Sequence, residues 1–358
     1  MAILYLDEQG SSVYREKGIL IVKKDENILA KIPFAQIDSI IILGAVFITP
    51  SALNLILGNS IFTSFLTIDG RYKGSLFSGF SKNIFLRLKQ YELYNNQEFR
   101  QQFSKIIVLN KIKNNYTLLL KYKRNHRNAE IDEEIGKIKS IIDNLKEIKK
   151  ININQLLGIE GISSKYYFSA FSKMLRKELV FKKRTSHPPK DPVNSLLSLG
   201  YTLLFNEFVS LIYSNGLDPF IGYYHELEYG RESLAVDLME GFRFIIDSFV
   251  LQLINKNVIK KDDFEFNTEK GCYILKDKPR KSFYKSYEEK LLTNITIDGK
   301  LINYRKIFSN QVLNFSKSLK DNSINTNNNK NIVLVDEKDN LVLQNNQQYK
   351  FFEPFIYR

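Results

Sequence analysis

The first part of the chain, up to about Ser81, alternates short apolar runs with polar turn residues. These runs are strand-length and rich in β-branched and aromatic residues, as in "GILIVKK", "DSIIILG" and "FTSFLTID". One segment differs, because Thr49 is a good N-cap, Pro50 suits the first helical position and Gly58 can end a helix. Residues 1–81 are therefore expected to form a small β domain with one short helix.

Beyond Ser81 the pattern changes, and apolar residues recur three and four positions apart with charges between them. This period predicts helices in "FLRLKQYELY", "FSKIIVLNKIKNNYTLLLKY", "IDEEIGKIKSIIDNLKE", "SSKYYFSAFSKML", "VNSLLSLGYTLLFNEF" and the stretch from Ser233 through "IIDSFVLQLIN". From 321 to 331 the chain is polar and low in complexity, which is typical of a loop. The pattern as a whole predicts an α+β protein, with a large helical domain at 82–358 after the β domain.

The charge balance points to a polyanionic partner. Lys and Arg number 52 against 39 Asp and Glu, which gives a net charge of +13 and favours nucleic acid. The alternative is a basic protein from a proteome rich in Lys, Asn and Ile. The single cysteine excludes an intrachain disulfide, and charges interrupt the long apolar runs, so we expect a cytoplasmic protein with no membrane partner.

The stretch "SLAVDLMEGFRF" places two carboxylates, Asp237 and Glu240, in an otherwise apolar helix. The helix is apolar nearly all round, which is typical of a core helix. Burying each carboxylate costs several kcal/mol unless a cation compensates its charge. Arg243 offers one explanation, a buried intrahelical ion pair with Glu240. A bound metal ion offers another.

Two further residues suggest the metal. His225 ends the aromatic run "GYYH" shortly before the carboxylate helix, and Glu160 lies between Gly158 and Gly161, just before an expected helix. A structural histidine and an exposed acid at a helix N-terminus are the simpler alternatives. Together, Glu160, His225 and Glu240 would form an oxygen-rich site with one imidazole, which suits Mg²⁺ or Mn²⁺ and phosphodiester chemistry.

Four ordered motifs carry a family resemblance: "GIEGISSKYYFSAF", "DPVNSLLSLGYTLLFNE", "GLDPFIGYYHE" and "RESLAVDLMEGFR". In this order they closely resemble the CRISPR-associated spacer-acquisition integrases, the Cas1 family. The N-terminal strands and "GRYKGSLFSG" are similar to that family's β domain, so the resemblance covers most of the chain.

The resemblance implies a β-sandwich-like N-terminal domain used for dimerisation, a helical catalytic domain, and a homodimer that assembles with a Cas2 dimer. It implies a divalent-metal site with Glu160, His225 and Glu240 as ligands and Asp237 as an additional active-site acid. The family often has "EEFRP" where this chain has "EGFRF", so we expect Gly241 and Phe244 to change how the helix continues.

The predicted activity is a metal-dependent DNA integrase and endonuclease, which joins the 3′-OH ends of captured double-stranded fragments to the CRISPR repeat by transesterification. A mobile-element integrase with the same metal site and a non-catalytic DNA-binding scaffold are the alternatives. Residues that we expect to contact DNA are Tyr167, Lys182, Lys183, Arg184, Arg231 and Arg243. For Tyr167 a core position, and for 182–184 a solvated surface, are the competing interpretations.

Overall fold

The structure is a computed structural model that describes residues 2–68, 70–79, 83–176, 178–186, 188–297, 299–321 and 354–356. Of the loop expected at 321–331, only Asp321 belongs to this described part, as the last residue of a helix. The rest of that loop lies outside the described residues.

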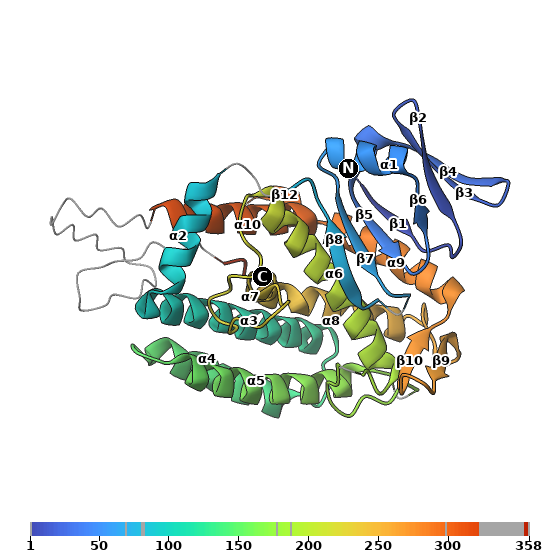
Figure 1. Ribbon diagram of the computed structural model, residues 1–358. Helices are drawn as coiled ribbons and strands as arrows, with labels where there is room; N and C mark the ends of the chain where they lie inside the picture. The colour runs from blue at the N-terminus through green and yellow to red at the C-terminus, as the bar shows by residue number, and fades with distance from the viewer. Residues whose placement is uncertain are drawn as a thin grey trace. The chain divides into compact units, whose positions relative to one another are not determined.

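The N-terminal strands form two four-stranded sheets (Figure 1). The first sheet has the order β1 (Ala2–Leu6), β5 (Ile37–Leu43), β7 (Phe62–Leu66) and β8 (Tyr72–Leu76). Its first three strands are parallel and β8 is antiparallel to β7. The second sheet has the order β4 (Asn27–Pro33), β3 (Ile19–Lys24), β2 (Ser12–Glu16) and β6 (Phe47–Ile48).

The predicted helix between these strands is confirmed as α1 (Pro50–Gly58). The hydroxyl of Thr49 accepts a hydrogen bond from the Ala52 amide at 3.4 Å, and Pro50 occupies the first turn, where a missing N–H costs nothing. A single apolar core collects side chains from both sheets and this helix, including Val13, Ile40 and Ile56. A short 3₁₀ helix, η1 (Phe34–Gln36), precedes β5.

By contacts the chain divides into two compact units. The first unit holds residues 1–80 together with 185–210 and 260–288, and the second holds 81–184, 211–259 and 289–358. The first segment of the first unit thus ends beside the boundary expected at Ser81. The dimerisation role of the β domain stays a prediction.

Helices dominate the second unit. They are α2 (Ile84–Tyr94), α3 (Gln97–Asn125), α4 (Asp132–Glu147), α5 (Ile153–Met174), α7 (Ser233–Met239), α8 (Arg243–Asn255) and α10 (Tyr304–Asp321), with the 3₁₀ turn η2 (Glu240–Phe242). The long helices α3, α4 and α5 pack against one another (Figure 1). Asparagine caps begin two of them, since Asn96 accepts from the Phe99 amide and Asn152 forms a capping box with Gln155.

A strand-rich N-terminal part followed by a mostly helical part confirms the expected fold class, but the C-terminal part is not entirely helical. It contains two antiparallel hairpins, β9 (Phe264–Asn267) with β10 (Cys272–Leu275) and β11 (Asn294–Ile297) with β12 (Lys300–Asn303). The remaining elements are α6 (Pro192–Ser214), η3 (Lys261–Asp263) and α9 (Asp277–Leu292). These hairpins are only four residues per strand, too short for their alternation to stand out.

Within the described residues, α6 is the one helix that is long and apolar enough to cross a membrane by length and composition. In its most apolar window, 67% of the helix is buried inside the protein. A core helix has the same character, so α6 is weak evidence for a membrane span.

Candidate active site

Glu160 comes from the middle of α5, not from a position before a helix as its flanking glycines suggested. Gly158 and Gly161 lie inside the helix, with open space where each Cβ would be. The capping box at Asn152 starts the helix ten residues, almost three turns, earlier than expected. The interpretation of Glu160 as an N-terminal acid is therefore wrong, and its carboxylate needs other partners.

The loop before α7 is folded around the carboxylate of Asp237. Oδ2 accepts hydrogen bonds from the backbone amides of Tyr223 at 2.6 Å and Tyr224 at 3.0 Å. Oδ1 accepts from the backbone amide of His225 at 3.0 Å and from its ring Nδ1 at 2.7 Å. Asp237 is fully buried, so these four donors replace its hydration.

The same loop has one position that only glycine can fill. A Cβ on Gly222 would lie 2.8 Å from the backbone carbonyl carbon of Ser233, at the start of α7. The loop backbone therefore approaches the helix closely enough for the amides of 223–225 to reach Asp237. This approach sets the imidazole of His225, whose side chain is 17% exposed, beside the carboxylate.

The helix expected to run from Ser233 to Asn255 is interrupted at Glu240. The chain forms α7, one 3₁₀ turn at Glu240–Phe242, and then α8. A Cβ on Gly241 would approach Nδ2 of Asn110 to 2.8 Å, and Phe244 is buried. The departure from the family pattern at these two positions thus coincides with the interruption.

Glu240 is buried and lies between two cationic side chains. Its Oε1 accepts a hydrogen bond from Nε of Arg243 at 2.7 Å, which confirms the intrahelical ion pair considered above. Its Oε2 lies 2.6 Å from the ammonium of Lys111 on α3. Burial alone would raise the pKa of Glu240, but the charges of Arg243 and Lys111 outweigh it and hold that pKa well below its usual range.

Lys111 is the residue that sequence reasoning missed. Its ammonium also pairs with Oε1 of Glu160, so it bridges the two carboxylates. Burial disfavours the charged amine, yet Glu240 and Glu160 more than compensate and raise the pKa of Lys111. In the sequence it is one of many lysines, and no local pattern marks it as buried.

Tyr224 completes the cluster from the loop side. Its hydroxyl donates to Oε2 of Glu160 at 2.9 Å, and its ring lies edge-on to His225 with centroids 4.8 Å apart. Burial and the nearby Glu160 raise the pKa of Tyr224 far above its usual value, so the phenol stays protonated. The structure thus brings Glu160 and Glu240 together through Lys111, with Asp237 and His225 beside them.

The residues expected to contact DNA lie elsewhere, with one exception. Tyr167 is a core residue that is 1% exposed, and its hydroxyl donates to Asp247 at 2.7 Å, which favours the competing interpretation. Lys182 and Lys183 are exposed and Arg184 is half-buried in the segment after α5. Arg231 pairs with Glu228 in the loop, and Arg243 alone belongs to the cluster.

Comparisons with known proteins place the chain in a family. The family model described as CRISPR associated protein Cas1 matches residues 4–289, most of the chain. The chain belongs to the Cas1 family. A Cas1 endonuclease from Thermodesulfovibrio yellowstonii is 36% identical over 290 residues, which cover 78% of this chain and 91% of the relative. One from Thermus thermophilus is 33% identical over 312 residues, 86% of this chain and 90% of the relative.

Solved structures agree with the Cas1 fold. A Cas1 protein from Thermotoga maritima superposes with a TM-score of 0.77 at 28% identity, covering 89% of this chain and 97% of the other. A chain of a Cas6-RT-Cas1–Cas2 complex gives a TM-score of 0.78 at 26% identity, covering 89% of this chain and 35% of that one. A casposase bound to its integration product gives 0.79 at 24% identity, covering 90% of this chain and 91% of that one, and shows the shared fold alone. The expected activity, a Cas1 integrase and endonuclease of CRISPR adaptation, is confirmed.

Proposed function

We propose that this Cas1 protein joins DNA 3′-OH ends to a CRISPR repeat at the cluster of Glu160, His225 and Glu240, with Mg²⁺ or Mn²⁺ bound there. The observation that carries the proposal is the convergence of a buried carboxylate, Glu240, and a half-buried one, Glu160, on one ammonium, beside a histidine held by a buried aspartate. Burying this many charged groups is costly, so a site of this kind is more typical of function than of stability.

The donor chemistry fits a hard divalent cation. Oε2 of Glu240 is buried and accepts no well-directed hydrogen bond from the described residues, although Lys111 lies close to it as an ion pair. His225 donates from Nδ1 to Asp237, which leaves the lone pair of a neutral imidazole on Nε2. Among the described residues no three His, Cys, Asp or Glu side chains already stand at metal-ligand spacing, and the ammonium of Lys111 lies between the two glutamates.

In the proposed site Glu160, Glu240 and Nε2 of His225 are the ligands, and Asp237 is a positioning residue. Each carboxylate oxygen of Asp237 already accepts two hydrogen bonds, so neither oxygen is available to bind a metal ion. The bond to Nδ1 also fixes the tautomer of His225. A bound divalent ion would polarise the scissile phosphodiester and stabilise the leaving oxygen. Lys111 and Arg243 offset the negative charge of the glutamates, and Tyr224 orients Glu160.

The proposed reaction exchanges one phosphodiester for another. The 3′-oxygen of the captured fragment forms a new bond to a phosphorus of the repeat, and the bond from that phosphorus to the repeat's own 3′-oxygen breaks. The attacking hydroxyl loses a proton and the leaving oxygen gains one, so neither ATP nor an external oxidant is needed. Positioning and charge stabilisation then supply most of the rate.

The proposed partners are double-stranded DNA, a second copy of this chain and a Cas2 dimer, in the cytoplasm and with no membrane. The net charge of +13 favours DNA. One structural relative is a chain of a Cas6-RT-Cas1–Cas2 complex. Of the basic residues named from the sequence, Lys182 and Lys183 are exposed, and we propose that they meet a phosphate backbone.

The test is joining of a short duplex with free 3′-OH ends to a supercoiled plasmid that carries the cognate repeat, in the presence of Cas2 and Mn²⁺ or EDTA. Glu240→Gln keeps the side-chain size but removes a ligand charge, and we expect joining to fall by about a hundredfold or more. Glu134→Gln is the matched control, because Glu134 is also buried and paired with a lysine, Lys173 at 2.6 Å, away from the cluster. Joining that survives Glu240→Gln, or that proceeds equally in EDTA, contradicts the proposal.

A further inference from the structure

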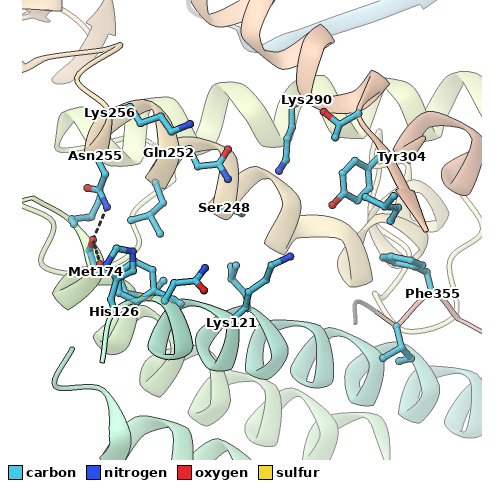
Figure 2. Close-up of a pocket in the computed structure, with 18 of the residues that line it drawn as sticks. Lys121, His126, Met174, Ser248, Gln252, Asn255, Lys256, Lys290, Tyr304 and Phe355 are labelled. Carbon is cyan, nitrogen blue, oxygen red and sulfur yellow. Dashed lines mark hydrogen bonds between the residues drawn. The ribbon is translucent and has the colours of Figure 1, made fainter. Parts of the chain in front are cut away.

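A large cavity in the second unit lies apart from the carboxylate cluster. Its volume is about 1120 Å³, and its walls come from the C-terminal ends of α3, α5 and α8, from Lys290 onward, and from residues 354–356 (Figure 2). None of Glu160, His225 and Glu240 lines it. The proposed reaction therefore leaves this cavity unexplained.

The lining is cationic. Four lysines line it, Lys121, Lys173, Lys256 and Lys290, together with Arg176, and no acidic side chain is among the lining residues, although Lys173 is paired with Glu134. In Figure 2, Lys290 reaches into the space from one wall and Lys121 from the opposite wall. Lys290 and Lys256 form no ion pair with an acid in the described part of the chain, and Lys290 lies 5.6 Å from the ring centre of Tyr304.

Placing these ammonium groups close together in a partly buried cavity disfavours their charged forms. Burial, together with the charges of Lys121 and Lys256, lowers the pKa of Lys290 from 10.5 to about 8. A bound anion would relieve both the repulsion and the lost hydration. The cavity is thus suited to a negatively charged ligand.

The uncharged lining residues indicate what the anion carries. The rings of Tyr122 and His126 stack with centroids 4.3 Å apart, and the Phe355 ring lies on another part of the wall. The side-chain amides of Asn125 and Gln252 form no hydrogen bond with described residues and face a roomy cavity. Aromatic faces, amides and ammonium groups in one pocket match the base and the phosphate of a nucleotide.

We propose that this cavity is a nucleotide-binding site, in which Lys121, Lys256 and Lys290 bind the phosphate while the aromatic and amide side chains receive the base. The ligand is either a free nucleoside phosphate or an unpaired nucleotide of a DNA strand, which share this chemistry. An unpaired nucleotide of a DNA strand as the ligand rests on the proposed DNA-joining function. A free nucleoside phosphate as the ligand does not.

The cavity and the carboxylate cluster take residues from the same three helices, α3, α5 and α8, and Phe355 of the cavity wall packs on the 3₁₀ turn that holds Glu240. On α3, Lys111 and Lys121 are ten residues apart, which corresponds to about 15 Å along the axis. The ring of Phe355 stacks on Phe242 at 5.6 Å, and its carbonyl accepts from Nδ2 of Asn114 at 2.9 Å. A strand of two or three nucleotides is long enough to connect the two places.

The experiment measures binding in EDTA, so that it is independent of any metal and of joining. The probe is 5′-fluorescein-labelled pentathymidylate, followed by fluorescence anisotropy, with dTMP and thymidine as unlabelled competitors. The variant is Lys256→Gln with Lys290→Gln. The matched control is Lys317→Gln with Lys320→Gln, which removes the same charge from two exposed positions on α10 outside the lining.

We expect the cavity variant to lose about tenfold or more in affinity and the control less than about twofold, because phosphate contacts dominate such binding. Competition by dTMP but not by thymidine indicates that a free nucleotide suffices. Binding of the oligonucleotide without competition by dTMP indicates that the strand is the ligand. Equal affinity of the cavity variant and its control overturns the proposal, and so does thymidine that displaces the probe as well as dTMP does.

A second variant guards against misfolding. Lys256 is exposed, so Lys256→Glu does not put the fold at risk, and Lys317→Glu is its control. Charge reversal at the cavity is expected to weaken pentathymidylate binding more than the neutral change does. A Lys256→Glu protein that binds like Lys317→Glu also overturns the proposal.

Discussion

Replacing Asp237 by Asn keeps the shape of the side chain but removes the charge that holds His225. The carboxylate accepts four hydrogen bonds, two at each oxygen, and an amide has only one oxygen. If the amide nitrogen takes the place of Oδ2, it meets the N–H groups of Tyr223 and Tyr224. If it takes the place of Oδ1, it meets one backbone N–H and the ring Nδ1 of His225.

The second orientation costs less, because the imidazole can move its proton to Nε2 and accept at Nδ1. One buried backbone N–H is then left unpaired, which costs about 1–3 kcal/mol of the free energy of unfolding. The metal affinity is expected to suffer as well. A proton on Nε2 removes the lone pair that the proposed metal needs, so we expect Mn²⁺ affinity to fall by about 10–100-fold.

Three measurements on Asp237→Asn check this reasoning: denaturant unfolding, calorimetric Mn²⁺ titration, and the ¹⁵N chemical shifts of the His225 ring. The control is Asp247→Asn, a second fully buried aspartate, which accepts from the hydroxyl of Tyr167 at 2.7 Å. A hydroxyl can also accept from an amide, so this control is expected to keep wild-type Mn²⁺ affinity. An Asp237→Asn protein with wild-type Mn²⁺ affinity and an unprotonated Nε2 would refute the argument.

Two further predictions concern stability. Gly241→Ala places a methyl group 2.8 Å from Nδ2 of Asn110, a buried side chain that Asn114 already engages, so thermal or denaturant unfolding is expected to show a loss of about 1–3 kcal/mol; unchanged stability would mean that Asn110 moves freely. For Lys290 the pKa is lowered in the folded state from 10.5 to about 8, so the unfolded chain binds the extra proton between these values and the free energy of unfolding rises with pH there. Lys290→Met is expected to lack this rise when both proteins are unfolded in denaturant at pH 7.5, 9 and 10, and parallel curves for the two proteins would contradict the assignment.

The amino-acid sequence was sufficient for most N-terminal strands, for several helices, and for naming five acids and bases of the cluster, which are Glu160, His225, Asp237, Glu240 and Arg243. Period-two and period-3.6 patterns depend on residues that are close in the chain, so β1 to β5, β7, β8, α1 and the helices from α2 to α8 could be predicted, whereas the two-residue strand β6, α9 and α10 were not. Asp237 and Glu240 could be recognised as candidate site residues because they lie in an apolar helix, where a buried charge requires a compensating partner. The intrahelical partner Arg243 was predictable for the same reason, since it lies three residues away.

The tertiary structure decided the partners that come from distant parts of the chain. Lys111 meets Glu160 across 49 residues of sequence, and no local pattern encodes that encounter. The four donors to Asp237 come from a loop whose path depends on the close approach at Gly222, so its positioning role was visible only in three dimensions. At the helix break, Gly241 lies so close to Asn110 of another helix that a Cβ would come within 2.8 Å of Nδ2, and no local pattern encodes that approach.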